Sequence, residues 1–224
     1  MLTVAALGKW ASAGAGKFFR KENPPVEIRT YPAEYRFITE NEIRQTVLRE
    51  TDKKYTETEN ARRAELALEK NPFVENAEVY YTGNGGMAVE IEQITPLAYV
   101  EMRSGKMMMD TKGRLKPVPA HDRPRLPVIK NVPDRKQARR LYPLMAALDD
   151  DLFFKNKIRS IELRNGKIVL HLRGIPPVEM GGTDAYPYKL AKTKEIIRFL
   201  KQHNKLQRYS AIDVRYQGQV VCRQ

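Results

Sequence analysis

The stretch NAEVYYTGNGGMAVEIEQ, residues 76–93, predicts two antiparallel strands joined by a short glycine-rich connection. Apolar and polar residues alternate on both sides of GNGG (83–86), as they do in strands with one buried face. Glycine tolerates the positive φ angles that tight hairpin turns require. A phosphate-binding loop is disfavoured, because GNGG joins two strands and no Lys-Ser/Thr pair follows it. The stretch therefore predicts a β-hairpin.

Upstream of this hairpin, VEIRT (26–30) predicts a strand, and two helical patterns follow it. The first helix is expected over 37–50, where Thr39 and Glu42 have the spacing of a capping box. The second is expected over 58–72 and should stop there, because the residue before a proline avoids helical dihedrals. The order strand, helix, helix, strand, strand predicts a three-stranded sheet covered on one face by two helices.

Downstream of the hairpin, the sequence predicts a mainly antiparallel β module with two helices, so the whole chain is expected to be α+β. Short strand patterns are separated by turn signals, of which Asn165-Gly166 is the strongest. Helices are expected over 134–150, capped by its first residue, an aspartate, and over 186–205. The proline-rich stretch 119–133 is expected to be mainly loop.

These patterns divide the chain into a leader (1–24), a compact domain (25–96) and a C-terminal β domain (97–224). The leader is mildly apolar, but Lys9 interrupts it and small residues dilute it. It falls short of the roughly 20 apolar residues that span a bilayer, and it lacks the order of a signal peptide. We expect a flexible or weakly helical leader, and a remnant of a membrane segment stays open as an alternative.

The chain carries a net charge of +13, which draws a protein toward anionic surfaces such as nucleic acid, anionic lipid or an acidic partner. Basic residues are scattered along the chain, which favours a generally basic surface, and their densest cluster lies at 135–140. A nucleic-acid-binding protein is one alternative, although no aromatic-basic stacking motif is present in the sequence. Cys222 is the only cysteine, so no intrachain disulfide can form.

The sequence offers no constellation of catalytic or metal-binding residues. The histidines, His121, His171 and His203, lack the spacing of metal ligands. The run Asp149, Asp150 and Asp151 could bind a hard cation, but a solvated helix end is the simpler interpretation. Its position opposes the helix dipole, a cost that the sequence leaves unexplained. We therefore expect no enzyme activity, no metal and no cofactor.

The stretch AIDVRYQGQVVCRQ, residues 211–224, predicts a second hairpin with a two-residue turn at Gln217-Gly218. No element follows its last strand in the sequence, so that strand is expected to expose a row of unpaired backbone N–H and C=O groups. Such an edge can accept an extended segment of a partner as an added strand. The alternative is that this hairpin simply closes the sheet.

Several short motifs, in a consistent order, resemble those of a known family. They are P-x-V-x-x-A-x-V at Pro72, Val74, Ala77 and Val79, D-x-x-G at Asp110 and Gly113, L-P-V-I at 126–129, I-D-V-R-Y at 212–216 and QVVC at 219–222. Over about residues 25–224, the chain resembles the bacterial cell-division proteins of the FtsQ (DivIB) family, in the version found in Bacteroidetes. One departure is at 93–96, where the family has Q-R-x-P and this chain has QITP, without the arginine.

The resemblance implies a POTRA domain followed by a β domain, in a non-catalytic scaffold of the divisome. It implies an inner-membrane protein at the division septum, mostly periplasmic, whose family anchors through an N-terminal helix that is not evident in this leader. The implied partners are FtsB-like and FtsL-like division proteins and not nucleic acid, with FtsB adding a strand at the C-terminal edge. The residues expected to receive it are Arg215, Tyr216, Gly218, Gln219, Val220, Val221, Cys222 and Arg223. A POTRA-bearing polypeptide-transport or outer-membrane assembly factor is the alternative, which would predict tandem repeats or a barrel.

Overall fold

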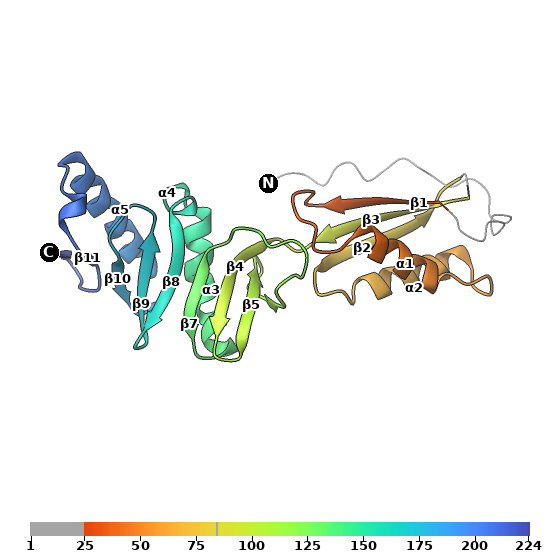
Figure 1. Cartoon of the computed structure of the whole chain (residues 1–224), viewed down its shortest axis with the longest axis horizontal. Coiled ribbons are helices and arrows are strands. Elements are labelled where there is room, and N and C mark those ends of the chain that lie inside the picture. The colour runs from red at the N-terminus through yellow and green to blue at the C-terminus, as the bar shows by residue number, and fades with distance from the viewer. Residues whose placement is uncertain (1–24, 84) are drawn as a thin grey trace. The chain divides into compact units, whose positions relative to one another are not determined.

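The computed structural model describes residues 25–83 and 85–224, and the predicted leader at 1–24 lies outside them (Figure 1). The chain divides into an N-terminal unit that ends at Gln93 and a C-terminal unit, Ile94–Gln224. The N-terminal unit contains β1 (Val26–Tyr31), α1 (Glu40–Glu50), α2 (Glu57–Leu68), β2 (Val74–Tyr81) and β3 (Met87–Gln93). Its strands form one sheet in the order β1-β3-β2, with β1 parallel and β2 antiparallel to β3.

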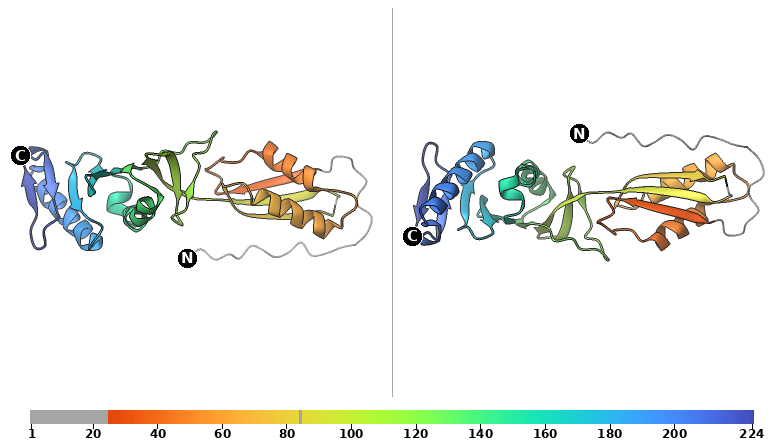
Figure 2. Two further views of the ribbon diagram at one scale, coloured as in Figure 1. Left: turned by 90° about the horizontal axis from the view of Figure 1, so that it is seen from below. Right: turned by 90° about the horizontal axis from the view of Figure 1, so that it is seen from above.

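Both helices of the N-terminal unit cover the same face of its sheet (Figure 2). Ile43 and Val47 of α1 and Ala64 of α2 are fully buried, and they form a core with strand residues such as Val89 and Ile91. The predicted three-stranded sheet with two helices is confirmed.

Helix starts in the N-terminal unit follow local capping signals. The Thr39 hydroxyl accepts from the Glu42 amide, and the Glu42 carboxylate accepts from the Thr39 amide at 2.7 Å, which confirms the predicted capping box. A second capping box, between Thr56 and Glu59, starts α2. The prediction missed it and also placed the end of α2 too late. The helix ends at Leu68 because the chain turns there, with the Asn71 amide donating to the Leu68 carbonyl at 3.0 Å.

The C-terminal unit contains a sheet of nine strands in the order β12-β11-β10-β9-β8-β7-β4-β5-β6. Most neighbouring pairs are antiparallel, and three are parallel: β4–β7, β7–β8 and β10–β11. Its elements are β4 (Pro96–Met102), β5 (Gly105–Asp110), β6 (Leu115–Lys116), β7 (Val128–Val132), α3 (Arg135–Asp150), α4 (Leu152–Lys155), β8 (Ile158–Arg164), β9 (Lys167–Leu172), β10 (Val178–Gly181), α5 (Tyr186–Gln202), the 3-10 turn η1 (Leu206–Arg208), β11 (Ala211–Asp213) and β12 (Val221–Arg223).

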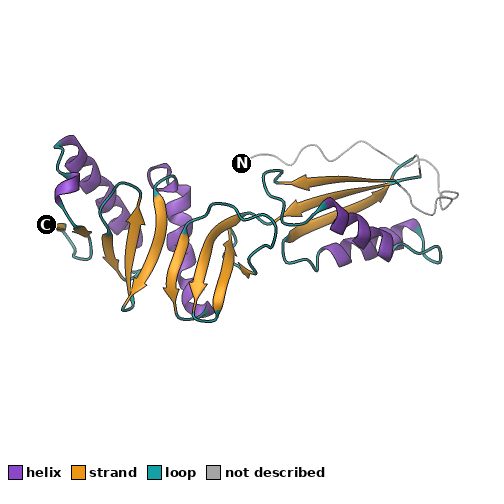
Figure 3. Ribbon diagram, viewed as in Figure 1, coloured by secondary structure: helices purple, strands orange, loops and turns teal. Residues whose placement is uncertain are grey.

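Helices α3 and α5 lie on the same face of this sheet (Figure 3). Leu141, Leu144 and Ile197 from these helices join one continuous apolar core with strand residues. Asp134 caps α3 as predicted, because its carboxylate accepts from the Gln137 amide at 2.7 Å. The described residues also include two short elements that the prediction lacked, α4 and η1. The predicted α+β class is confirmed.

The predicted loop at 119–133 is wrong in part, because it contains β7. This strand lies between β4 and β8 and runs parallel to both. Ile129 and Val132 are fully buried in it. Pro127 and Pro133 stand directly before and after the strand, where no ladder N–H is needed, and the other two prolines of the stretch lie further upstream.

The predicted turn at Asn165-Gly166 is confirmed between β8 and β9. Both residues have positive φ, 52° and 74°, as a two-residue hairpin turn of the primed kind requires. The local sequence signal therefore fixes the register of this hairpin.

The acidic run at 149–151 was predicted to be a solvated helix end. That interpretation is incomplete, because two of its three carboxylates have partners. Asp151 accepts from the Phe153 amide at 2.9 Å and so caps α4, and it also binds the Lys194 ammonium at 2.7 Å. The hydrogen bond from Lys194 lowers the pKa of Asp151. Asp149 pairs with Lys155 at 3.4 Å. These two aspartates thus connect α3 to the next helices, and this offsets their unfavourable place in the dipole of α3.

Candidate functional site

Strand β12 forms one outer edge of the nine-stranded sheet. It pairs only with β11, in the register Ala211↔Arg223, Ile212↔Cys222 and Asp213↔Val221. Among residues 25–83 and 85–224, none pairs with the other side of β12. The predicted C-terminal edge is therefore open within the described chain.

The hydrogen bonds of β11 show which backbone groups of β12 face outward. The amides of Ile212 and Val214 donate to β10 and its flank, at 2.9 Å to the Pro177 carbonyl and 3.0 Å to the Glu179 carbonyl. Backbone groups of successive strand residues point to opposite sides, so the intervening residues of β11 face β12. The N–H and C=O of Cys222, at the centre of β12, consequently point to the open side.

The connection between β11 and β12 is wider than the predicted two-residue turn. The pairing of β11 with β12 ends at Asp213 and Val221, so residues 214–220 form a seven-residue loop between the two strands. Gly218 lies in this loop with φ of 78°, a conformation that favours glycine. The chain turns at Gln217-Gly218 as predicted, but the predicted two-residue connection is wrong because the strands do not pair up to this turn.

A buried lysine explains the shape of this loop. Lys192 of α5 is only 8% exposed, and its ammonium donates to the carbonyls of Tyr216 and Gln219, each at 2.6 Å. Its ammonium also lies 5.2 Å from the centre of the Tyr188 ring. A buried ammonium requires such partners, because an unpaired charge in the interior is costly. Lys192 thereby attaches both ends of the turn at Gln217-Gly218 to α5.

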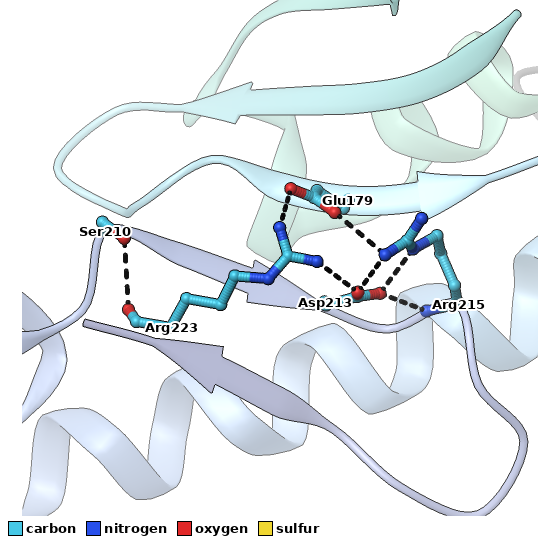
Figure 4. A network of polar contacts seen from close by, with 5 residues as sticks. All are labelled: Glu179, Ser210, Asp213, Arg215 and Arg223. Carbon is cyan, nitrogen blue, oxygen red and sulfur yellow. Dashed lines mark hydrogen bonds and ion pairs between the residues drawn. The ribbon is translucent and has the colours of Figure 1, made fainter.

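An ion-pair cluster connects β10, β11 and β12 (Figure 4). Asp213 is fully buried and accepts from Arg215 Nε at 2.9 Å and from Arg223 Nη2 at 3.0 Å. Glu179 of β10 accepts from Arg223 Nη1 at 2.8 Å and forms an ion pair with Arg215 at 3.3 Å. The guanidinium of Arg215 beside Asp213 holds the pKa of that carboxyl below its usual value. Arg223 thereby attaches the edge strand to the sheet.

The side chains of β12 divide between the two faces of the sheet. Val220, just before the strand, and Cys222 are half-buried against the core. Burial raises the pKa of the Cys222 thiol. Val221 and Arg223 are exposed on the opposite face. One face of β12 therefore packs against the core and the other is exposed.

A groove of about 340 Å³ lies next to the open edge, between α5 and the loop at 214–220. Its lining combines apolar, aromatic and charged side chains with loop backbone, from Tyr188, Lys192, Glu195, Ile196, Phe199, Gly218, Gln219 and Val220. Phe199 is 51% exposed, which is high for a phenylalanine. One of its lining residues, Val220, directly precedes β12.

The structure brings all eight sequence-predicted residues to this corner of the sheet, in β12 and the loop before it. Arg215 lies in the ion cluster, whereas Tyr216 is 48% exposed, with the Arg215 guanidinium 5.5 Å from its ring centre. Sequence reasoning missed Lys192 and Glu179, which hold the loop and the strand in place. Neither has a local signal, because their partners are distant in the sequence.

Two family models match the chain. One, described as FtsQ/DivIB, C-terminal related, matches residues 95–223, which is more than half of the sequence. The other, described as a POTRA-like domain, matches residues 26–92. No curated protein matches the chain.

Within the described residues, no helix has both the length and the apolar character needed to cross a bilayer. The same part of the chain holds no group of three His, Cys, Asp or Glu side chains placed to bind a metal ion.

Proposed function

Because the chain belongs to the FtsQ/DivIB C-terminal related family, and so to a family of cell-division scaffold proteins, we propose that it recruits division proteins by strand addition at β12. The partners are FtsB-like and FtsL-like proteins, with an extended segment of the FtsB-like protein pairing with the edge. In this role the protein holds other proteins together at the division septum and catalyses no reaction.

One observation carries the proposal: the outward N–H and C=O of Cys222 have no partner on the open side of β12 within the described residues. An incoming strand would satisfy these groups by the same ladder that joins β12 to β11. Because β12 spans only three residues, Val221–Arg223, main-chain bonds alone would give a weak complex. The adjacent groove would therefore add side-chain contacts.

Two features prepare the edge for binding. Lys192 fixes the loop through Tyr216 and Gln219, and Arg223 fixes β12 through Asp213 and Glu179. A pre-ordered edge loses little conformational entropy when a partner binds, so more of the interaction free energy appears as affinity. The net charge of +13 would further accelerate encounter with acidic partner segments.

The proposed location is the bacterial inner membrane at the division site, with the two described units in the periplasm. The observation that supports this is family membership.

The decisive experiment compares Cys222→Pro with Cys222→Ala in binding to a purified FtsB-like division protein from the same organism. Proline removes the outward N–H and leaves the ladder to β11 intact, since that N–H makes no bond within the sheet. We expect Cys222→Pro to bind at least about tenfold more weakly and Cys222→Ala to bind like the wild type. Undiminished binding by a folded Cys222→Pro protein would reject strand addition at β12.

Alanine at the same position is the matched control, because it removes the thiol and keeps the N–H. Circular dichroism and a thermal melt of both variants would show that the sheet is intact. Tyr216→Glu is an independent probe of the loop side, and we expect it to weaken binding as well.

A further inference from the structure

The two edges of the N-terminal sheet differ in how they are covered. At the β2 edge, the Glu65 carboxylate of α2 accepts from the Val79 amide at 3.1 Å, so the protein's own helix occupies part of that edge. The β1 edge is six residues long, Val26–Tyr31, and pairs with β3 alone. Within residues 25–83 and 85–224, no hydrogen bond reaches the other side of β1.

The register of β1 identifies its outward backbone groups. The Met87 amide donates to the Pro25 carbonyl at 2.8 Å, and Val26 lies opposite Met87 in a parallel pair. By alternation, the backbone N–H and C=O groups of Glu27 and Arg29 bond to β3. Those of Val26, Ile28 and Thr30 point to the free side. Ile28 is the central residue of this outward set.

The charges on β1 are arranged symmetrically about Ile28. Glu27 precedes it and Arg29 follows it, and both side chains are exposed on the face of the sheet without helices. If a second copy of β1 runs antiparallel with Ile28 opposite Ile28, Glu27 of each copy lies opposite Arg29 of the other. Val26 then lies opposite Thr30. The strand is therefore complementary to itself in both hydrogen bonding and charge.

We propose that β1 is a homotypic interface, through which two copies of this chain join their three-stranded sheets into one continuous sheet. The pair has twofold symmetry, as most protein dimers do, and the two Ile28 residues exchange both backbone hydrogen bonds. The interface is small, so the dimer is weak and forms at high local concentration. The β1 interface lies in the N-terminal unit and is separate from the proposed partner recruitment at β12 in the C-terminal unit.

The first test is a charge swap, measured by sedimentation velocity over a range of concentrations of the full chain. Arg29→Glu places like charges opposite each other at two symmetry-related positions and should weaken the dimer about tenfold. The double variant Glu27→Arg/Arg29→Glu restores opposite charges and should dimerise within about twofold of the wild type. These variants leave β12 unaltered, so their outcome is independent of strand addition there.

A wild-type chain that stays monomeric at every concentration would overturn the proposal and assign the β1 edge to another occupant. A double variant that dimerises no better than Arg29→Glu would also overturn it, because charge pairing across the twofold axis would then be absent. Thermal melts of all variants would show that weakened dimers are not unfolded monomers.

The second test is disulfide trapping in a Cys222→Ser background, which removes the only cysteine. Positions 27 and 29 of opposite copies form a non-hydrogen-bonded pair with Cα atoms about 4.5 Å apart, a distance that a disulfide can bridge. A mixture of Glu27→Cys and Arg29→Cys proteins should therefore cross-link at least about tenfold faster than either alone. Equal rates, or no cross-linking in the mixture, would contradict the proposed register.

Discussion

The ammonium of Lys192 and the carbonyl oxygen of Tyr216 lie 2.6 Å apart, although 24 residues separate them in the sequence. The same ammonium binds the carbonyl of Gln219, so one helical side chain organises the loop that leads into the edge strand. The conformation of the proposed binding edge therefore depends on a residue of α5 as well as on the hairpin itself.

Replacing Lys192 by methionine should destabilise the protein by about 1–3 kcal/mol, because two inward-facing carbonyls lose their shared donor. Urea unfolding measures this change, and hydrogen exchange should show faster exchange in residues 214–220. Lys201→Met on the same helix is the control, since Lys201 is exposed and its loss should change stability by less than about 0.5 kcal/mol. Equal stability and equal exchange in the two variants would contradict the role of Lys192.

Replacing Asp213 by asparagine should lower the free energy of unfolding by about 1–3 kcal/mol, because Arg215 and Arg223 lose their shared carboxylate. Both arginines are partly exposed, so solvent reduces the cost relative to a fully buried pair. Glu179→Gln is the matched control, with a smaller loss expected because Glu179 is 25% exposed at its side chain. The prediction fails if Glu179→Gln costs as much as Asp213→Asn.

The stability that Asp213 contributes should depend on pH in the acid range. Its pKa is lowered in the folded protein, chiefly by Arg215, so the unfolded state binds the proton more readily. The contribution is therefore fully present above the unfolded pKa of about 3.9 and is lost as the pH falls through the folded value. The difference in unfolding free energy between wild type and Asp213→Asn should shrink as the pH falls from about 6 to below 4. A difference that stays constant over this range would show that the carboxylate charge does not matter.

Replacing Phe199 by glutamate should weaken binding of an FtsB-like partner about tenfold, because the exposed ring lines the groove beside β12. Stability should change by less than about 0.5 kcal/mol, since the ring is half exposed. Leu66→Glu is a suitable control, because Leu66 is 44% exposed and lies on α2 in the other unit. Isothermal titration calorimetry would measure both affinities, and equal loss in the two variants would exclude a specific role for the groove.

The sequence predicted those parts of the fold that local interactions decide. Thr39 with Glu42, Asp134, and the Asn165-Gly166 turn were identified correctly, because each signal and the structure it produces lie within a few residues. Strand β7 was missed because its burial depends on β4 and β8, which are distant in the sequence. Its flanking prolines gave the opposite local signal.

At the candidate site, too, the features set by neighbouring residues could be predicted, and those set by residues distant in the sequence could not. The alternation in 211–224 and Gly218 were sufficient to predict a hairpin at the edge of a sheet. The two-residue connection was wrong, and nothing near Gln217 shows that the ammonium of a buried lysine, Lys192, binds the carbonyls on both sides of the turn. The aspartates at 149–151 were misinterpreted for a similar reason, since the partner of Asp151 is Lys194 on α5.

The parallel pairing of β7 with both β4 and β8 also has a kinetic consequence. The hairpins on either side of β7 can form early from local contacts, but the two halves of the sheet cannot join until β7 closes two long loops. Formation of this strand is therefore expected to limit the refolding rate of the C-terminal unit, and it leaves two hairpin edges exposed to aggregation until it is complete.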